Sequence, residues 1–352
     1  MPGDTEDSPR GTDAPPSVTG PDAGAAFPAA PAFGADDRLG QRVPDFLLVA
    51  PDGTHSGFYE RHCGRPAVLL LAPDAESCSE LVAGLEPASV LCLLAAAAFE
   101  PGRWTFPCIP EAGELAETLG ETLPPPGAAP LALVLDASLR LVERIFGPAP
   151  EQLARSLAGL AAAPPAPLTA VAPVLMLPGV LEPALCAKLI AAFESDHFES
   201  GMPRNVGDEL RLLPDPAAKR RHDHLLRDEA LVAAVTDRIV ERVLPDVVAA
   251  FHHEVTHLEG FKVARYDADV RGFFRAHRDN TTPDARHRRF ALTLNLNGGY
   301  EGGALAFPEF GPQRYHPAAG GALVFSGSLL HEAGEVTAGR RYVLLTFMWG
   351  ES

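Results

Sequence analysis

Two segments rich in Pro and Ala divide the 352-residue chain and limit what it can fold into. The first, residues 1–37, is also acidic, and the second reads LAAAPPAPLTAVAP from Leu160 to Pro173. Such stretches bury too little apolar surface to offset the entropy of ordering them, and Pro-rich runs act as stiff spacers. We therefore expect a disordered tail over 1–37, a first domain over 38–160, a linker over 161–173 and a second domain over 174–352.

The charge and the apolar runs exclude several classes of partner. The formal net charge is −17, whereas a domain that holds nucleic acid by its phosphates is normally basic. The apolar run Val90–Phe99 is much shorter than the ~20 residues that span a bilayer, and the N-terminus lacks the pattern of a signal peptide. Five cysteines without metal-type spacing do not indicate a disulfide framework. The sequence predicts a cytoplasmic protein with no nucleic acid and no membrane as partners.

In the first domain, apolar runs alternate with helical patterns. The expected strands are Val43–Val49, Pro66–Leu71, Ala88–Ala97 and a hairpin of Leu131–Leu135 with Leu139–Ile145, and the expected helices are Ser77–Leu85 and Pro150–Leu160. Strands that alternate with helices are typical of an α/β sandwich.

This order of elements resembles the peroxiredoxin branch of the thioredoxin fold. The segments that carry the resemblance are GQRVPDFLLVAPDG (Gly40–Gly53) and GRPAVLLLAPDAESC (Gly64–Cys78), and it covers about 40–160. It implies a thioredoxin-like α/β domain in which Pro130 stands where that fold usually has a cis-proline.

The reactive site of that family is not reproduced. Peroxiredoxins carry Thr or Ser three residues before the reactive Cys, but Ala75 stands three before Cys78. A reactive thiol also needs a lowered pKa, and Glu76 and Glu80 flank Cys78. We expect Cys78 to be half-buried and unreactive. The alternative function is a thiol-dependent peroxidase that uses Cys78, with the second domain as an accessory.

The second domain begins with helical patterns and continues with short strands. The expected helices are Leu181–Glu194 and Asp228–Phe251, the latter broken near Pro245, and the expected strands are Phe290–Leu296, Ala304–Phe307, Ala322–Phe325 and Arg341–Met348. Such an order predicts a small β-barrel or jelly roll buttressed by helices.

Two histidines and an aspartate form a candidate metal site in this domain. His277 and Asp279 are two residues apart on an extended segment, so both side chains point the same way. His331 follows 52 residues after Asp279 and completes the two-histidine, one-carboxylate face of non-haem iron(II) oxygenases. The string is weak alone, since His222-Asp223-His224 is similar; we take that second string as surface or as support behind the site.

A candidate anion-binding residue, Arg341, lies ten residues beyond His331. A guanidinium is permanently charged and meets a carboxylate with two parallel hydrogen bonds. Arg340 is a rival, but alternation along the strand places Arg341 on the apolar, inward face.

Together these segments resemble the prolyl 4-hydroxylase superfamily of 2-oxoglutarate and iron(II) oxygenases. The segments that carry the resemblance include ARYDADVRGFFRAHRDN (Ala264–Asn280) and HEAGEVTAGRRYVLLTF (His331–Phe347). The resemblance implies an α+β double-stranded β-helix (jelly roll) with buttressing helices. It implies hydroxylation of a C–H bond in a peptidyl (prolyl-like) or small-molecule substrate, using O2 and releasing succinate and CO2.

The same resemblance implies roles for individual residues. His277, Asp279 and His331 would bind Fe(2+), Arg341 would bind the distal carboxylate of 2-oxoglutarate, and Tyr266 would line that pocket. A turn at Gly302-Gly303 would lead into the next barrel strand, and Asn295 stands where the family often has a Tyr, so a hydroxyl contact to the co-substrate is absent or replaced. Ascorbate as a further cofactor and a homodimer are also expectations from this resemblance.

Two alternatives stay open at this point. Seven arginines around the H-x-D string form either a cationic rim for an anionic substrate or loop charges balanced by acids: Arg265, Arg271, Arg275, Arg278, Arg286, Arg288 and Arg289. The second domain is either an enzyme or a metal-binding module that never forms succinate; the intact triad with Arg341 favours the enzyme.

Overall fold

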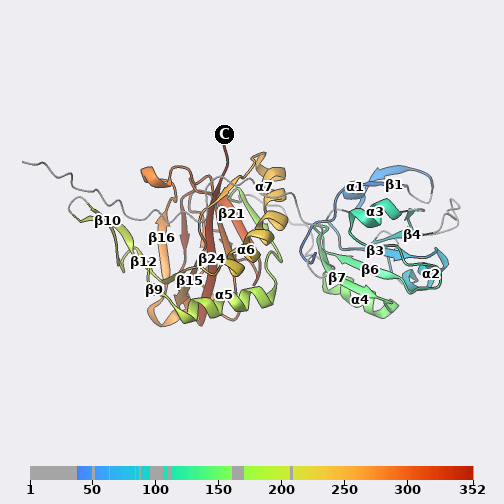
Figure 1. Cartoon of the computed structure of the whole chain (residues 1–352), viewed down its shortest axis with the longest axis horizontal. Coiled ribbons are helices and arrows are strands. Elements are labelled where there is room, and N and C mark those ends of the chain that lie inside the picture. The colour runs from blue at the N-terminus through green and yellow to red at the C-terminus, as the bar shows by residue number, and fades with distance from the viewer. Residues whose placement is uncertain are drawn as a thin grey trace, which may run out of the picture.

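The computed structural model describes residues 38–49, 52–62, 64–83, 85–86, 89–95, 106–109, 112–160, 170–206 and 209–351. The expected disordered tail, and residues 161–169 of the expected linker, lie outside these ranges. The described residues form two lobes that lie side by side (Figure 1).

The first lobe is built on a mixed five-stranded sheet. Its order is β5 (Cys108–Ile109), β4 (Val90–Leu94), β3 (Ala67–Ala72), β6 (Leu131–Leu135) and β7 (Leu141–Phe146). The first three strands are parallel, and β6 and β7 run antiparallel to their neighbours. A separate hairpin joins β1 (Leu47–Val49) to β2 (His55–Gly57).

Helices cover both faces of this sheet. One apolar core joins the sheet to α2 (Glu76–Val82) and α4 (Pro150–Gly159), and a second joins it to β1, α1 (Phe58–His62) and α3 (Gly113–Thr118). Every residue of β3 is buried because its side chains enter the two cores alternately.

The predicted α/β architecture is confirmed for this lobe, and each predicted strand and helix has a counterpart there. The short elements α1, α3, β2 and β5 were not predicted. The described ranges contain no cis peptide bond, so the expectation of a cis-proline at Pro130 is wrong. The peptide bond before Pro130 is trans, as most X–Pro bonds are. The thioredoxin-like relationship stays a prediction.

The second lobe contains two facing β-sheets. The large one runs β8 (Val174–Leu177), β21 (Ala322–Ser326), β17 (Phe290–Asn295), β24 (Arg340–Trp349), β15 (Lys262–Asp267), β13 (His222–Leu225) and β9 (Phe198–Glu199), with β14 (His257–Leu258) also on β24. The small one runs β12 (Lys219–Arg220), β16 (Phe273–His277), β22 (His331–Ala333), β19 (Leu305–Ala306) and β20 (Arg314–Tyr315).

Each face of the large sheet has its own core. Tyr342, Leu344 and Met348 of β24 pack against the helices α5 (Pro183–Ser195), α6 (Glu229–Arg242) and α7 (Leu244–Phe251). The intervening Val343 enters the core between the two sheets, together with Leu345 and Phe347. Strand alternation therefore separates a helix-facing side from a barrel-facing side. This arrangement confirms the predicted jelly roll with buttressing helices.

The predicted helices of this lobe are confirmed at their expected places. Asp228 caps α6 by accepting a hydrogen bond from the N–H of Leu231, and the break predicted near Pro245 separates α6 from α7. All six residues of Phe290–Asn295 are buried, because helices cover one face of this strand and the small sheet covers the other. The two-residue and three-residue strands were not predicted individually.

The end of the expected linker is anchored to the barrel. Ala172 is buried in the core between the sheets, and its N–H donates to the hydroxyl of Tyr315 at 2.7 Å. Two further two-stranded sheets lie outside the main sheets. One pairs β10 (Met202–Val206) with β11 (Glu209–Leu213), and the other pairs β18 (Glu301–Gly302) with β23 (Val336–Ala338).

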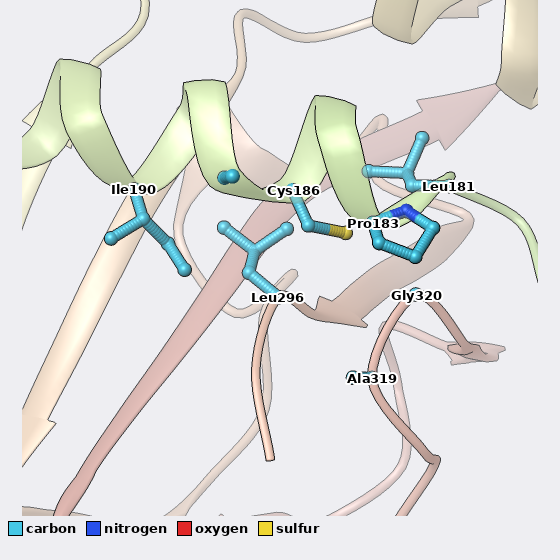
Figure 2. Close-up of a pocket in the computed structure, with 8 residues that line it drawn as sticks. Leu181, Pro183, Cys186, Ile190, Leu296, Ala319 and Gly320 are labelled. Atoms are coloured by element: carbon cyan, nitrogen blue, oxygen red, sulfur yellow. The ribbon is translucent and has the colours of Figure 1, made fainter.

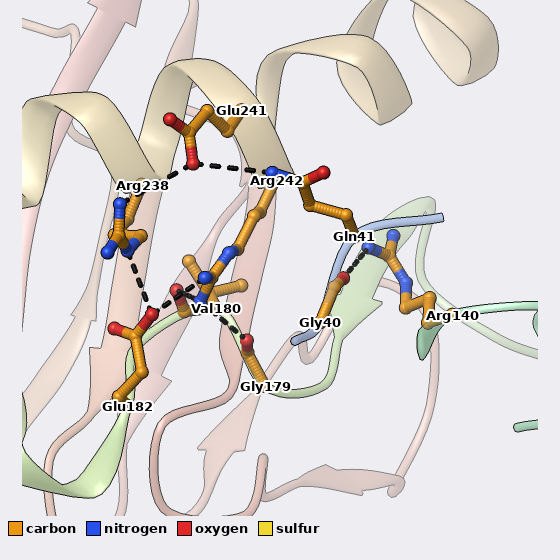
Figure 3. A network of polar contacts seen from close by, with 9 residues as sticks. All are labelled: Gly40, Gln41, Arg140, Gly179, Val180, Glu182, Arg238, Glu241 and Arg242. Carbon is orange, nitrogen blue, oxygen red and sulfur yellow. Dashed lines mark hydrogen bonds and ion pairs between the residues drawn. The ribbon is translucent and has the colours of Figure 1, made fainter. Parts of the chain in front are cut away.

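Polar contacts join the two lobes. Arg140 of the first lobe donates to the carboxylate of Asp246 in α7, and Arg42 lies 3.4 Å from the same carboxylate. Figure 3 shows Arg242 reaching from α6 toward Glu182, where its Nη2 lies 2.6 Å from Oε1, beside the Gly40 segment. A Cβ at Gly40 would lie 2.3 Å from the carbonyl oxygen of Gly179, so the lobes approach through backbone there.

An apolar pocket lies between α5 and the end of β17 (Figure 2). Its lining residues are Leu181, Pro183, Cys186, Ala187, Ile190, Leu296, Ala319 and Gly320. Burial raises the pKa of Cys186, its one ionisable side chain, to about 11, so this pocket offers no reactive group near neutral pH. Within the described ranges, no helix combines the length and the apolarity needed to cross a bilayer.

Candidate metal centre

Three potential metal ligands meet where β16 and β22 pair. His277 ends β16, His331 begins β22, and the two are cross-strand partners with ring centroids 4.3 Å apart. Asp279 follows two residues after His277, and its N–H donates to the carbonyl of Gly327 at 2.9 Å. One nitrogen or oxygen atom of each residue lies within 4.8 Å of the others.

Hydrogen bonds select which nitrogen of each imidazole faces the centre. Nδ1 of His277 lies 2.8 Å from the carbonyl oxygen of Arg275, and Nδ1 of His331 lies 3.0 Å from that of Leu329. A carbonyl oxygen only accepts, so Nδ1 carries the proton and Nε2 keeps a lone pair. Each Nε2 lies 3.4 Å from an oxygen of Asp279. The result is a two-nitrogen, one-oxygen face of the kind that holds iron(II).

The electrostatics favour the metal-binding forms of these groups. Burial alone would raise the pKa of Asp279, but the contacts with His277 and His331 outweigh burial and lower that pKa. Burial lowers the pKa of His331, although the Asp279 carboxylate opposes this effect. A deprotonated carboxylate and a neutral imidazole are the ligand forms that metals require.

Aromatic rings surround the histidines on the barrel side. Phe274 stacks on His277 with centroids 3.6 Å apart, and Phe325 lies 4.6 Å from the ring of His331. The His277 side chain keeps 20% of its surface exposed and that of His331 only 6%. The site is therefore open on the His277 side and closed by apolar rings on the other.

Arg341 lies inside the barrel, and Arg340 lies outside it. Arg341 is 2% exposed, its Nη2 donates to Oδ1 of Asn295 at 3.0 Å, and its Cζ lies 5.5 Å from the Tyr266 ring. Arg340 keeps 56% of its side chain exposed and pairs with Asp267 at 3.1 Å. No carboxylate of the described residues pairs with Arg341, and its Nε has no hydrogen-bond partner among them. A buried cation in that state requires an anion.

The Gly-Gly turn makes room for this arginine. A Cβ at Gly303 would lie 2.9 Å from Cδ of Arg341, and one at Gly302 would lie 2.2 Å from the carbonyl oxygen of Glu335. Both glycines have positive φ, 75° and 67° in chain order, which other residues adopt at a cost. The predicted turn is present, and it brings backbone directly against the guanidinium stem.

Tyr266 and Asn295 both lie beside Arg341. Tyr266 is its cross-strand partner in β15, and Asn295 orients it while donating from Nδ2 to the carbonyl of Pro317 at 2.6 Å. Sequence reasoning missed Tyr300, whose buried hydroxyl has no hydrogen-bond partner within the described part of the chain. Burial raises the pKa of Tyr300, against the nearby charge of Arg341. Its position just before the Glu301-Gly302-Gly303 turn was the available signal.

Five of the seven arginines around the H-x-D string form ion pairs with acids. Arg271 lies 2.8 Å from Glu335, Arg278 lies 2.7 Å from Glu309, and Arg288 lies 2.6 Å from Glu259. These three acids lie far along the chain from their arginines, and each neutralises the charge of its partner. This observation favours solvated, balanced loop charges over a cationic rim. Asp223 of the similar HDH string is buried, and its carboxylate lies 2.9 Å from Nε of Arg221.

Cys78 lies outside this site and is fully buried in the first lobe, so the expectation of half-burial is wrong. The helix α2 that carries it packs directly on the sheet, where its neighbours include Cys92 and Cys108. Burial, with contacts from Cys108 and Cys78, raises the pKa of Cys92. Cys63 lies outside the described residues.

Comparison with known proteins identifies the second lobe. The family described as the 2OG-Fe(II) oxygenase superfamily matches residues 261–349, which include the triad and Arg341. No curated protein sequence matches the chain.

Similar solved structures include three prolyl hydroxylases. A Pseudomonas putida prolyl-4-hydroxylase is 17% identical over 52% of this chain and 95% of its own, with a TM-score of 0.38. The viral collagen prolyl hydroxylase of Paramecium Bursaria Chlorella virus-1, in its 2OG complex, is 17% identical over 50% and 94%, with a TM-score of 0.36. A Trichoplax adhaerens prolyl hydroxylase, in complex with a hypoxia inducible factor peptide fragment, is 16% identical over 50% and 83%, with a TM-score of 0.40. At such identities and TM-scores these similarities carry no conclusion about activity. The C-terminal part of the chain contains a 2OG-Fe(II) oxygenase domain, because residues 261–349 match that superfamily.

Proposed function

We propose that the second lobe is a 2-oxoglutarate-dependent Fe(II) dioxygenase that hydroxylates a C–H bond of its substrate. His277, Asp279 and His331 are the proposed iron ligands, and Arg341 is the proposed partner of the distal carboxylate of 2-oxoglutarate. The observation that carries this proposal is the buried, unpaired guanidinium of Arg341 in the same barrel as the three-ligand face.

The residues fit both groups. Two neutral imidazoles and a carboxylate suit iron(II), and they leave coordination positions for a bidentate oxoacid and O2. The unsatisfied Nε of Arg341 and hydroxyl of Tyr300 suit a carboxylate that accepts hydrogen bonds. When bound, the iron and 2-oxoglutarate supply the oxidising chemistry, with O2 consumed, succinate and CO2 released and one oxygen atom transferred to the substrate.

The side chains of this chain orient and shield the reaction. The carbonyls of Arg275 and Leu329 hold both imidazoles with Nε2 toward the centre. Asn295 fixes the guanidinium of Arg341, which makes the co-substrate site rigid before binding. Phe274 and Phe325 exclude water from the barrel side of the ligands.

A peptidyl, prolyl-like residue or a small molecule is the proposed substrate, and ascorbate is a proposed additional reductant. The alternative peroxidase function is disfavoured, because a fully buried Cys78 has no access to peroxide. A metal module without turnover would explain the triad but leave the buried charge of Arg341 unexplained.

The test is succinate formation from 2-oxoglutarate with Fe(II), with and without ascorbate, across a panel of peptides and metabolites. We expect wild-type turnover, and no turnover in His277→Ala. Peroxide consumption should be the same in wild type and Cys78→Ser. Absence of succinate with every substrate, coupled or uncoupled, would refute the enzymatic proposal.

A further inference from the structure

A second buried arginine, Arg221, lies next to Tyr266. It connects β12 to β13, where the chain passes from the small sheet to the large one. Its Nη1 donates to the Tyr266 hydroxyl at 3.0 Å, and its Cζ lies 5.3 Å from the Phe274 ring, which stacks on His277. Arg221 thus lies between the co-substrate side of the barrel and the metal side.

The charge of Arg221 is neutralised, unlike that of Arg341. Nε of Arg221 lies 2.9 Å from Asp223, whose other oxygen accepts from the Ser200 hydroxyl at 2.5 Å. Lys262 lies 3.6 Å from the same carboxylate. Burial would raise the pKa of Asp223, but Arg221 and Lys262 outweigh it and lower the pKa. Arg221 therefore does not need an anionic ligand, whereas Arg341 does.

The bond from Arg221 decides how Tyr266 can act. A phenol has a single proton, and a guanidinium only donates, so the Tyr266 oxygen must accept from Arg221. The proton of Tyr266 is then free to be donated to another acceptor. Arg341 also lies beside Tyr266, because its Cζ is 5.5 Å from the Tyr266 ring and it is the cross-strand partner of Tyr266 in β24.

We infer that Arg221 is a positioning residue that fixes Tyr266 as a hydrogen-bond donor to the carboxylate-bearing co-substrate held by Arg341. This inference rests on the proposed function. Stability alone does not account for the arrangement, because a buried ion pair is often no more stabilising than apolar residues of the same size. A buried pair whose further donor points at the Tyr266 hydroxyl serves to orient that hydroxyl.

The experiment measures 2-oxoglutarate affinity and melting temperature in the full chain. Mn(II) replaces iron under anaerobic conditions, so binding is read by calorimetry without turnover. The variants are Arg221→Met, Arg221→Lys, Tyr266→Phe and the double Arg221→Met/Tyr266→Phe. Arg220→Met is the matched control, since the exposed Arg220 donates to the backbone carbonyls of Pro216 and Val270 instead.

We expect Arg221→Met and Tyr266→Phe each to raise the Kd of 2-oxoglutarate roughly tenfold, as the loss of one charge-assisted hydrogen bond predicts. The double variant should bind no worse than Tyr266→Phe, because both changes remove the same oriented donor. Arg221→Lys should recover part of the affinity. Arg220→Met should match wild type.

Removal of Arg221 takes away the nearest cation of the buried Asp223, so Arg221→Met/Asp223→Asn is a second variant that removes both charges. If it melts like wild type and binds 2-oxoglutarate as tightly, the inference is overturned while the proposed function stands. Additive losses in the Arg221→Met/Tyr266→Phe protein would also overturn it. If wild type itself neither binds 2-oxoglutarate nor forms succinate, the proposed function has failed instead.

Discussion

Replacement of Arg341 by Met is expected to weaken co-substrate binding without weakening the fold. Arg341 is buried, its Nη2 donates to Oδ1 of Asn295, its Cζ lies 5.5 Å from the Tyr266 ring, and its charge lies near the Tyr300 hydroxyl. Those contacts stabilise the free protein by about 2–4 kcal/mol, while burying an unpaired cation costs several kcal/mol. The two terms nearly cancel, so the melting temperature of Arg341→Met should stay the same or rise by about 2–4 °C.

Arg341→Met should strongly weaken the binding of 2-oxoglutarate. Loss of two charge-assisted hydrogen bonds to a carboxylate corresponds to about 3–4 kcal/mol, or a ~10²–10³-fold increase in Kd. Arg340→Met is the control, because it makes the same change on the opposite face of β24. It removes one exposed ion pair with Asp267, which is worth about 0–1 kcal/mol, so the Kd should change less than about threefold.

Anaerobic calorimetry with Mn(II) and differential scanning fluorimetry measure both quantities on the same samples. Equal changes in Kd for the two variants would refute the assignment of Arg341. So would a large fall in the melting temperature of Arg341→Met, since that would show that the guanidinium is already satisfied in the free protein.

Other substitutions test the surroundings of the site. Gly303→Ala places a methyl group 2.9 Å from Cδ of Arg341 at a positive φ, so it should destabilise the fold by about 1–3 kcal/mol and raise the 2-oxoglutarate Kd; urea unfolding and calorimetry check this. Lys219 is buried, and burial lowers its pKa from 10.5 to about 7. Its charge therefore destabilises the fold by the full amount below pH 7. This destabilisation decreases as the pH rises from 7 to 10.5. Lys219→Met should therefore be more stable than wild type by a few kcal/mol (about 1.4 kcal/mol per pKa unit) near pH 7, and urea unfolding should show this advantage shrinking as the pH rises; a constant difference would contradict it. Asp246→Ala removes the carboxylate that Arg140 contacts, so small-angle scattering should show a larger radius of gyration at an unchanged 2-oxoglutarate Kd.

The sequence was sufficient where a local rule governs the structure. Alternation along Arg340–Trp349 correctly separated Arg341 from Arg340, because a strand between two cores sends successive side chains to opposite sides. The i, i+2 spacing of His277 and Asp279 likewise brought both side chains to one point.

Contacts between distant segments could not be predicted from spacing. The string that contains Arg221 and Asp223 resembles a solvated charged segment, and only the pairing of β13 with β15 reveals that it is buried beside Tyr266. The acids that balance the arginines of the H-x-D segment are also remote, such as Glu335 for Arg271. Periodicity indicates which face a residue takes, whereas partners are set by topology.

The place where the first lobe attaches limits how it can affect the reaction. It contacts α6 and α7 through Glu241 and Asp246, and these helices pack on the face of the large sheet that points away from the barrel. Arg341 points from the opposite face of the large sheet, and the triad lies beyond it where β16 and β22 of the small sheet pair. The two sets of contacts are thus separated by the thickness of the large sheet, which neither water nor substrate crosses. Any influence of the first lobe on the oxygenase must therefore pass through the packing of β17 and β24, or through recruitment of a substrate that both lobes hold.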